Sequence, residues 1–208
     1  MITNNVVLET IKNRRSIRSY TQEQIKDEEL EAILEAGRYA PSAINQQLWH
    51  FTVIQNQVLL SELNRSAKEV AAQFDDEHIR KLGENEKLNI FYGAPTVILV
   101  SGKKGGLQAG SDIGTAAREL LIEDSSLVKA DCAAATQNML LAAESLNLGA
   151  CWVNLTIFAF ASEKGQQFRQ QLQLPEGYNP LYSVIVGHKK LKQANAPVRK
   201  GNVVNYVR

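Results

Sequence analysis

The pattern of hydrophobic and polar residues predicts helices interleaved with strands along the whole chain. Helical spacing is clearest after Asp27, which can cap a helix, because Leu30, Ile33 and Leu34 then form one apolar stripe. Pro41 ends this helix, since the residue before a proline disfavours helical geometry. Further helices are predicted over residues 6–13, 59–74, 131–146 and 162–172.

Continuous apolar runs predict the strands, and the most uniform run covers residues 96–100. An apolar run without polar alternation is typical of a strand buried on both faces. Other short strands are predicted over residues 49–54, 150–154 and 181–186, and residues 203–207 form a strand or an extended arm. Buried strands interleaved with helices indicate a three-layer domain of the α/β or α+β class.

The predicted helix over residues 131–146 is rich in alanine and carries little charge on any face. A helix that is apolar all round is buried on all sides. One domain of this size has limited room to enclose such a helix, which hints at a second subunit packing over it.

Composition bounds the class of protein. A length of 208 residues is most simply one domain covering residues 1–208, and 44% hydrophobic with 22% charged residues is an ordinary globular mixture. The formal net charge of +1 leaves no global field for nucleic acid or a membrane surface, so any anion site must be local. The absence of an apolar run long enough for a signal peptide or a membrane span favours a cytoplasmic location.

Two familiar kinds of site are rejected. Residues 101–106 are rich in glycine and are expected to form an exposed loop, but Gly105 and Gly110 are followed by Ser111-Asp112 and not by the lysine of a phosphate-binding loop. No dinucleotide-binding glycine pattern follows a strand. Cys132 and Cys151 fit neither a metal-ligand spacing nor a disulfide framework.

Residues 14–18 concentrate groups that bind phosphate. In an extended segment Arg14, Ser16 and Arg18 point to one face, which places a hydroxyl between two guanidinium groups. Guanidinium donors form charge-assisted, often bidentate, hydrogen bonds with phosphate oxygens. The alternatives are a solvated basic turn and a set of structural ion pairs.

Five sequence blocks together resemble the nitroreductase family of flavin mononucleotide (FMN) enzymes. No single block is decisive, but the five occur in the family's order and cover nearly the whole chain. They are RRSIRSY at 14–20, APSAINQQLWHF at 40–51, DCAAATQNMLLAA at 131–143, LGACW at 148–152 and PVRK at 197–200.

The resemblance implies an α+β fold, with a mostly antiparallel central sheet flanked by helices, and an intertwined homodimer. Each of its two FMN sites lies at the subunit interface. The flavin nitrogen N5 is the reactive centre, so no side chain is assigned a catalytic role, and no metal is implied. A backbone N–H of the turn at 152–155 is the candidate for holding N5.

The resemblance also assigns cofactor-binding residues. Arg14 and Ser16 match the grip on the phosphate and ribityl chain, Arg15 contributes through its backbone, and Arg18 approaches the pyrimidine edge of the flavin. The segment that reaches the flavin from the other subunit comprises Pro41, Ser42, Ala43, Asn45 and Gln47. The loop beside N5 comprises Trp152, Val153, Asn154 and Leu155, and the C-terminal phosphate clamp comprises Arg199 and Lys200.

Some of these residues have simpler interpretations. Ser42 and Asn45 follow a proline and suit an ordinary turn, and Trp152 suits core packing as well as it suits a flavin contact. Asn154 and Leu155 stand where many relatives carry an acidic residue or a glycine pair, so Leu155 is expected to reshape the space above the flavin.

The expected function is an FMN-dependent oxidoreductase. A hydride passes from NADH or NADPH through flavin N5 to a small electron-poor acceptor, such as a nitroaromatic or a quinone, in a ping-pong exchange. One alternative is a dehydrogenase or dehalogenase-like enzyme for a single metabolite. Another is a non-enzymatic, anion-binding regulatory module.

Overall fold

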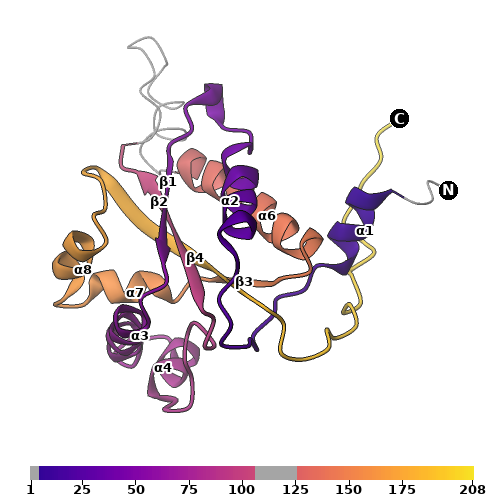
Figure 1. Cartoon of the computed structure of the whole chain (residues 1–208). Coiled ribbons are helices and arrows are strands. Elements are labelled where there is room, and N and C mark those ends of the chain that lie inside the picture. Colours follow the sequence, from indigo (N-terminus) through magenta and orange to yellow (C-terminus); the bar gives the residue numbers. More distant parts are fainter. Residues whose placement is uncertain (1–4, 106–125) are drawn as a thin grey trace, which may run out of the picture.

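A four-stranded antiparallel sheet forms the centre of the molecule in the computed structural model, which describes residues 5–105 and 126–208 (Figure 1). The strand order is β1-β2-β4-β3, and each neighbouring pair is antiparallel. The strands are β1 (Trp49–Ile54), β2 (Thr96–Lys103), β3 (Gly149–Val153) and β4 (Tyr178–Gly187). The predicted antiparallel α+β architecture is confirmed.

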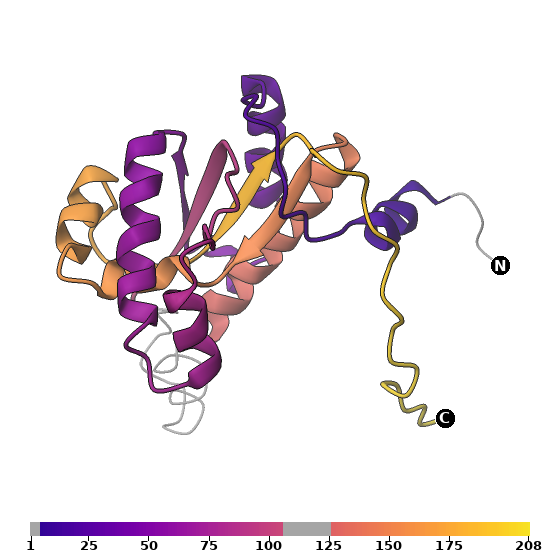
Figure 2. The same ribbon diagram turned by 90° about the horizontal axis from the view of Figure 1, so that it is seen from below.

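Helices cover both faces of this sheet (Figure 2). Side chains of β2 alternate between two apolar clusters, with Ile98 and Val100 on one side and Val97 and Leu99 on the other, all fully buried. The first cluster includes residues of α2 (Asp27–Arg38) and α6 (Ser126–Ser145), and the second includes residues of α3 (Gln57–Ala71) and α8 (Gly165–Gln171). The three-layer prediction therefore holds, and it explains why residues 96–100 lack polar alternation.

The helix boundaries differ from the predictions in several places. Lys26, not Asp27, is the N-cap of α2, and its N–H donates to Glu29 Oε2 at 2.8 Å. Asn56 caps α3, so this helix begins before residue 59, and it ends at Ala71. The pattern also missed α4 (Glu77–Glu84) and α7 (Thr156–Ala161), and the helix predicted over 162–172 is the shorter α8.

The prediction of an exposed loop over residues 101–106 is wrong for its first three residues. Ser101, Gly102 and Lys103 continue β2; the first two pair with both β1 and β4, and Lys103 pairs with Tyr178 of β4. Gly102 suits this place because a Cβ there would lie 2.6 Å from Val128 Cγ1 on α6. Lys104 and Gly105 form a turn, and the Gly110 to Asp112 part of the rejected phosphate loop lies outside the described residues.

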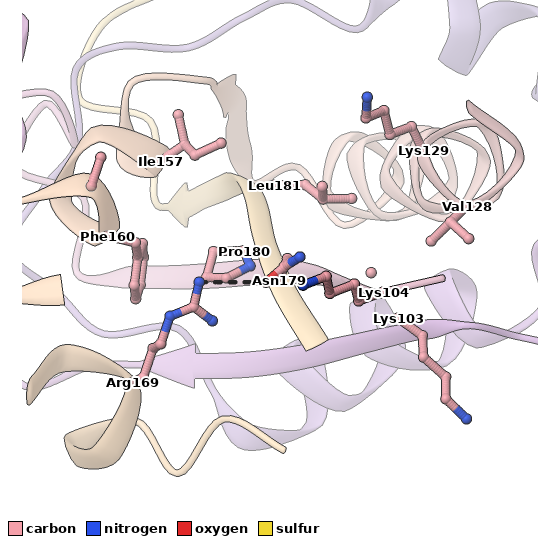
Figure 3. Close-up of a pocket in the computed structure, with 12 residues that line it drawn as sticks. Lys103, Lys104, Val128, Lys129, Ile157, Phe160, Arg169, Asn179, Pro180 and Leu181 are labelled. Atoms are coloured by element: carbon pink, nitrogen blue, oxygen red, sulfur yellow. Dashed lines mark hydrogen bonds between the residues drawn. The ribbon is translucent and has the colours of Figure 1, made fainter. Parts of the chain in front are cut away.

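A cavity of about 340 Å³ lies at this end of β2 (Figure 3). The start of β4, the first turn of α6, and the helices α7 and α8 form its walls. The cavity contains none of the residues predicted to bind FMN.

The two ends of the chain extend away from the sheet on the same side. Figures 1 and 2 show α1 (Val6–Asn13) and the last residues projecting together beyond the end of α6. No residue of α1 is buried, and Val198 and Val207 in the tail are 99% and 100% exposed. Residues 203–207 form no strand in the described part of the chain, so they are an extended arm.

One face of α6 packs on the sheet and the opposite face does not. Cys132, Ala135 and Met139 are fully buried, whereas Ala130 and Gln137 are exposed. The single chain therefore leaves part of α6 uncovered, and its burial by a second subunit stays a prediction. Across residues 5–105 and 126–208, no helix combines the length and apolar character needed to cross a membrane.

We expect Gly83→Ala to lower the free energy of unfolding by about 1–2 kcal/mol, measured by chemical denaturation. Gly83 is buried in α4, where a Cβ would lie 2.2 Å from the backbone nitrogen of Ala72, at the end of α3. This clash with backbone outweighs the gain of about 1 kcal/mol in helix propensity. Gly201→Ala is the matched control, because a Cβ at Gly201 meets nothing within 4 Å; equal stabilities of the two variants would contradict this account.

Candidate functional site

The basic segment at 14–18 is extended and lies beside β3. Ser16 forms a parallel bridge with Ala150, and the N–H of Ile17 donates to the Ala150 carbonyl oxygen at 3.0 Å. Tyr20 then forms an antiparallel bridge with Lys189. The predicted extended conformation is therefore present, and side chains of this segment must alternate between two faces.

Arg14, Ser16 and Arg18 all act electrostatically on one group, the Cys151 thiol of β3. Burial raises the pKa of the Cys151 thiol, whereas Arg18, a hydrogen bond with the Ser16 side chain and Arg14 act in the opposite direction. Cys151 itself is 1% exposed, while Ser16 and Arg18 are exposed. In an extended segment these three residues occupy positions of one face, and a donor set of two guanidinium groups and one hydroxyl suits a phosphate dianion.

Arg15 points elsewhere, as the alternation requires. Its Nη1 donates to the Lys12 carbonyl at 2.6 Å and to the Arg14 carbonyl at 2.7 Å. The side chain of Arg15 thus satisfies carbonyl groups at the end of α1, which leaves its backbone as its contribution to the basic segment.

Residues 152–155 lie at the end of the same strand and lead into α7. The basic segment and the loop predicted to lie beside flavin N5 are therefore both attached to β3. Val153 is buried at the end of β3, and Leu155 is half-buried as the N-cap of α7. Trp152 Nε1 donates to Asn154 Oδ1 at 2.7 Å, and the Trp152 and Tyr182 ring centroids are 4.3 Å apart. Trp152 is half-buried, which gives it core contact and an accessible edge together.

Segment 41–47 is tightly folded and is held by a carboxylate that the sequence analysis did not single out. The N–H of Ala43 donates to both oxygens of Asp131, at 3.1 and 3.2 Å. Burial raises the pKa of Asp131, and this hydrogen bond opposes the shift. Gln47 donates through its N–H to Ser42 Oγ at 3.0 Å and through Nε2 to Asn45 Oδ1 at 3.0 Å.

The backbone of this segment is strained. Ile44, Asn45 and Gln47 have φ angles of 45°, 57° and 52°, a region that residues other than glycine seldom adopt. Pro41 and Ile44 are exposed, the latter at 75%. Such strain persists only where the surrounding contacts fix the conformation, and the Asp131 carboxylate supplies one of these contacts.

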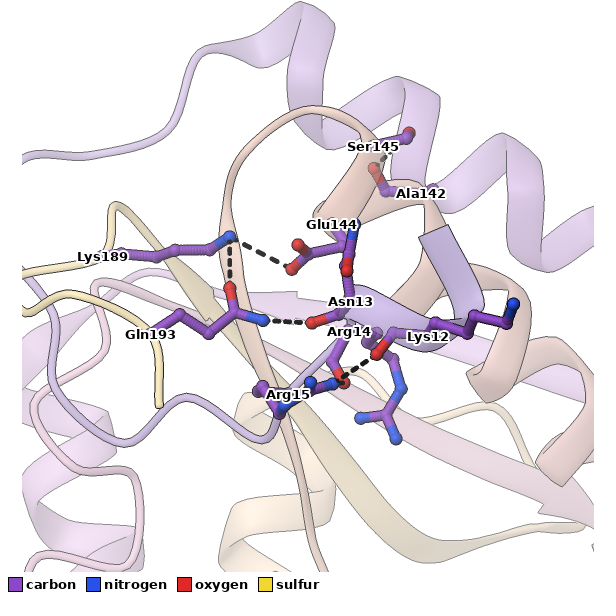
Figure 4. A network of polar contacts seen from close by, with 9 residues as sticks. All are labelled: Lys12, Asn13, Arg14, Arg15, Ala142, Glu144, Ser145, Lys189 and Gln193. Atoms are coloured by element: carbon purple, nitrogen blue, oxygen red, sulfur yellow. Dashed lines mark hydrogen bonds and ion pairs between the residues drawn. The ribbon is translucent and has the colours of Figure 1, made fainter. Parts of the chain in front are cut away.

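A second polar network joins the other end of α6 to both chain termini (Figure 4). Lys189 Nζ lies 3.1 Å from Glu144 Oε2 and donates to Gln193 Oε1 at 3.1 Å, and Gln193 Nε2 donates to the Asn13 carbonyl. The Lys189 and Glu144 side chains are 14% and 13% exposed. No local sequence signal pointed to this pair, because its partners are 45 residues apart.

These two anchors separate the predicted site into two parts. Asp131 and Glu144 are 13 residues apart on α6, a rise of about 20 Å. One chain therefore brings residues 14–18 together with the 152–155 turn and holds segment 41–47 far away. Arg199 and Lys200 lie in the exposed tail, where no hydrogen bond or ion pair connects them to the described residues.

Residues 5–105 and 126–208 contain no group of three or more histidine, cysteine, aspartate or glutamate side chains that could hold a metal ion. Cys132 and Cys151 are both buried free thiols.

Comparison with known proteins agrees with the five sequence blocks. The chain is 28% identical over 210 residues to FMN reductase [NAD(P)H] of Bacillus subtilis, an alignment that covers 97% of this chain and 73% of the relative. A crystal structure of a nitroreductase with bound FMN from Bacteroides fragilis has a TM-score of 0.81 and 35% identity, covering 98% of this chain and all of that one. A nitroreductase with bound FMN from Desulfitobacterium hafniense has a TM-score of 0.82 and 29% identity, with complete coverage of both chains.

The model of the nitroreductase family matches residues 11–188, which is well over half of the chain. This range includes the basic segment, the strained segment 41–47, all of α6 and the turn after β3. The chain therefore belongs to the nitroreductase family.

Proposed function

We propose that this protein is an FMN-dependent oxidoreductase that takes electrons from NADH or NADPH. The observation that carries the proposal is the extended segment beside β3, in which Arg14, Ser16 and Arg18 hold alternate positions and all act on the Cys151 thiol. Two structurally similar nitroreductases of this family contain bound FMN, and the Bacillus subtilis relative is named as an NAD(P)H-dependent FMN reductase.

The residues of this chain would have distinct roles toward FMN. Arg14 and Ser16 would bind the phosphate, and Arg18 would lie at the pyrimidine edge of the ring, where a cation favours the reduced form. The turn from Trp152 to Leu155 would flank the ring at N5. Bound FMN would supply the chemistry, accepting a hydride from NAD(P)H and passing it to a nitroaromatic or quinone that replaces the nicotinamide at the same face.

We further propose that two chains complete each site. Segment 41–47 lies about 20 Å along α6 from the basic segment, so a partner subunit would have to supply it. The unpacked face of α6, the apolar residues of α1 and the valines of the tail are suitable surfaces for that partner. The same assembly would bring Arg199 and Lys200 to the phosphate.

The visible spectrum of the purified protein tests this function. We expect flavin bands, present at purification or after addition of FMN, that bleach when NADPH or NADH is added without oxygen and return with a nitroaromatic or quinone. The protein should sediment at twice the 23.1 kDa of one chain. A protein that stays colourless with FMN would favour an anion-binding module, and rapid turnover of one metabolite beside weak nitroreduction would favour the specific dehydrogenase or dehalogenase-like enzyme.

Arg18→Ala should lower the reduction potential of the bound flavin by about 30 mV, the equivalent of about 1.4 kcal/mol for a two-electron couple. The physical reason is the loss of a cation whose attraction is greater for the reduced ring. A potentiometric titration measures this shift. Arg15→Ala is the matched control, because the Arg15 guanidinium is engaged with the Lys12 and Arg14 carbonyls, and equal potentials in the two variants would remove Arg18 from the proposed role.

Glu144→Gln should weaken FMN binding several-fold and lower the free energy of unfolding by about 2 kcal/mol, because it leaves the partly buried Lys189 ammonium without its counter-ion. The Lys189 network holds the Asn13 carbonyl next to Arg14, so its loss should loosen the basic segment. Flavin fluorescence gives the dissociation constant and denaturation gives the stability. Glu77→Gln removes the exposed ion pair with Lys81 and should change the stability by less than about 0.5 kcal/mol; if both variants bind FMN alike, the network does not support the site.

A further inference from the structure

The cavity at the end of β2 has an apolar floor and a basic wall. Phe160, Pro180 and Leu181 supply apolar surface, and the volume of about 340 Å³ lies within the usual range for small-molecule sites. Of the two aromatic residues of α7, Phe158 packs against Phe74 at a centroid distance of 5.3 Å, whereas Phe160 lines the cavity.

Among the residues that the structure describes, every charged residue lining this cavity is a cation. These are Lys103, Lys104, Lys129 and Arg169, and the described part of the lining contains no aspartate or glutamate. Among residues 5–105 and 126–208, none of these four forms an ion pair with a carboxylate. In a chain whose formal net charge is only +1, this is a marked local excess of positive charge.

Arg169 is already held in place within the cavity. Its guanidinium carbon lies 5.9 Å from the Phe160 ring centroid, and its Nη1 donates to the Tyr178 carbonyl at 3.2 Å. Nη2 donates to Asn179 Oδ1 at 3.5 Å, and Figure 3 shows Arg169 and Lys104 both extending toward Asn179. A guanidinium has five N–H donors, so donors remain for an anion, and a fixed side chain loses little entropy on binding one.

We propose that this cavity binds a small organic anion composed of a flat apolar ring and one acidic group. The ring would lie on Phe160 and Leu181, and the acidic group would accept hydrogen bonds from Arg169 and Lys104. Both halves of the ligand are required, because the cavity offers apolar contact on one side and, on the other, cations that have no carboxylate partner in residues 5–105 and 126–208. This site shares no residue with the proposed FMN site and goes beyond the proposed function.

Calorimetric titration of the full chain, as purified, with naphthalene-1-sulfonate tests the proposal. We expect binding at least tenfold tighter than that of 1-naphthalenemethanol, which lacks the charge, and of methanesulfonate, which lacks the ring. Equal affinities for the sulfonate and the alcohol would overturn the proposal, because the basic wall would then contribute nothing.

Substitutions of the lining cations test whether naphthalene-1-sulfonate binds in this cavity. Arg169→Gln and Lys104→Gln should each raise the dissociation constant about tenfold, by removing a charge-assisted hydrogen bond. Lys104 is exposed, so its variant keeps the test valid even if loss of the Arg169 stacking disturbs the fold. Arg65→Gln, in an exposed pair with Glu69 elsewhere on the surface, should leave the constant unchanged.

Arg18→Ala separates this cavity from the FMN site. It should leave naphthalene-1-sulfonate binding unchanged, whatever its effect on flavin. A dissociation constant that responds to Arg18→Ala, and to neither Arg169→Gln nor Lys104→Gln, would place the probe at the proposed FMN site and overturn the inference. Since the readout uses neither flavin nor turnover, this result is independent of whether the proposed function holds.

Discussion

The pairing of the N-terminal segment with β3 determines what the rest of the candidate site can do. A bridge at Ser16 and the hydrogen bond from the Ile17 N–H to Ala150 fix the segment as extended, and this conformation alone sorts the arginines between two faces. Gly149 permits the close approach, because a Cβ there would lie 2.8 Å from Ile17 Cγ2. Backbone pairing therefore decides which positions of this segment share a face.

The central helix α6 carries two carboxylates that hold distant segments of the chain. At one end Asp131 holds segment 41–47, and at the other Glu144 holds Lys189 and, through it, both termini. The residues assigned to FMN thus lie in two separate regions of a single subunit, one near each of these carboxylates. Neither region contains all of them. The exposed apolar surfaces on α1 and the tail have the same explanation in the proposed dimer.

The sequence predicted best where one physical signal dominated. The bounds of β1 and α1 agree with the structure, and the apolar run after Pro95 is the fully buried core of β2. The α4 helix was missed because its Glu77–Glu84 sequence is mostly polar, and α7 because its apolar residues are contiguous. The extension of β2 through Gly102 was hidden by a glycine that serves close packing, not a turn.

In the candidate site too, the sequence predicted features that depend on neighbouring residues and missed those that depend on contacts between distant residues. The extended conformation expected for residues 14–18 is present, and Arg14, Ser16 and Arg18 all act on the Cys151 thiol, while their role in binding phosphate stays a prediction. The roles of Asp131 and Glu144 could not be predicted, since each depends on a partner more than 40 residues away. The basic cavity beside Arg169 was equally hidden, because its cations come from separate elements that only folding brings together.

The spacing between Asp131 and Glu144 has an evolutionary consequence. Each residue added to or removed from a helix turns everything beyond it by about 100° and shifts it by about 1.5 Å. A single insertion between the two carboxylates would thus swing one of them off its partner, while substitutions on the solvent side would leave both in phase. Length in this stretch should consequently drift far less than the identity of its solvent-facing residues.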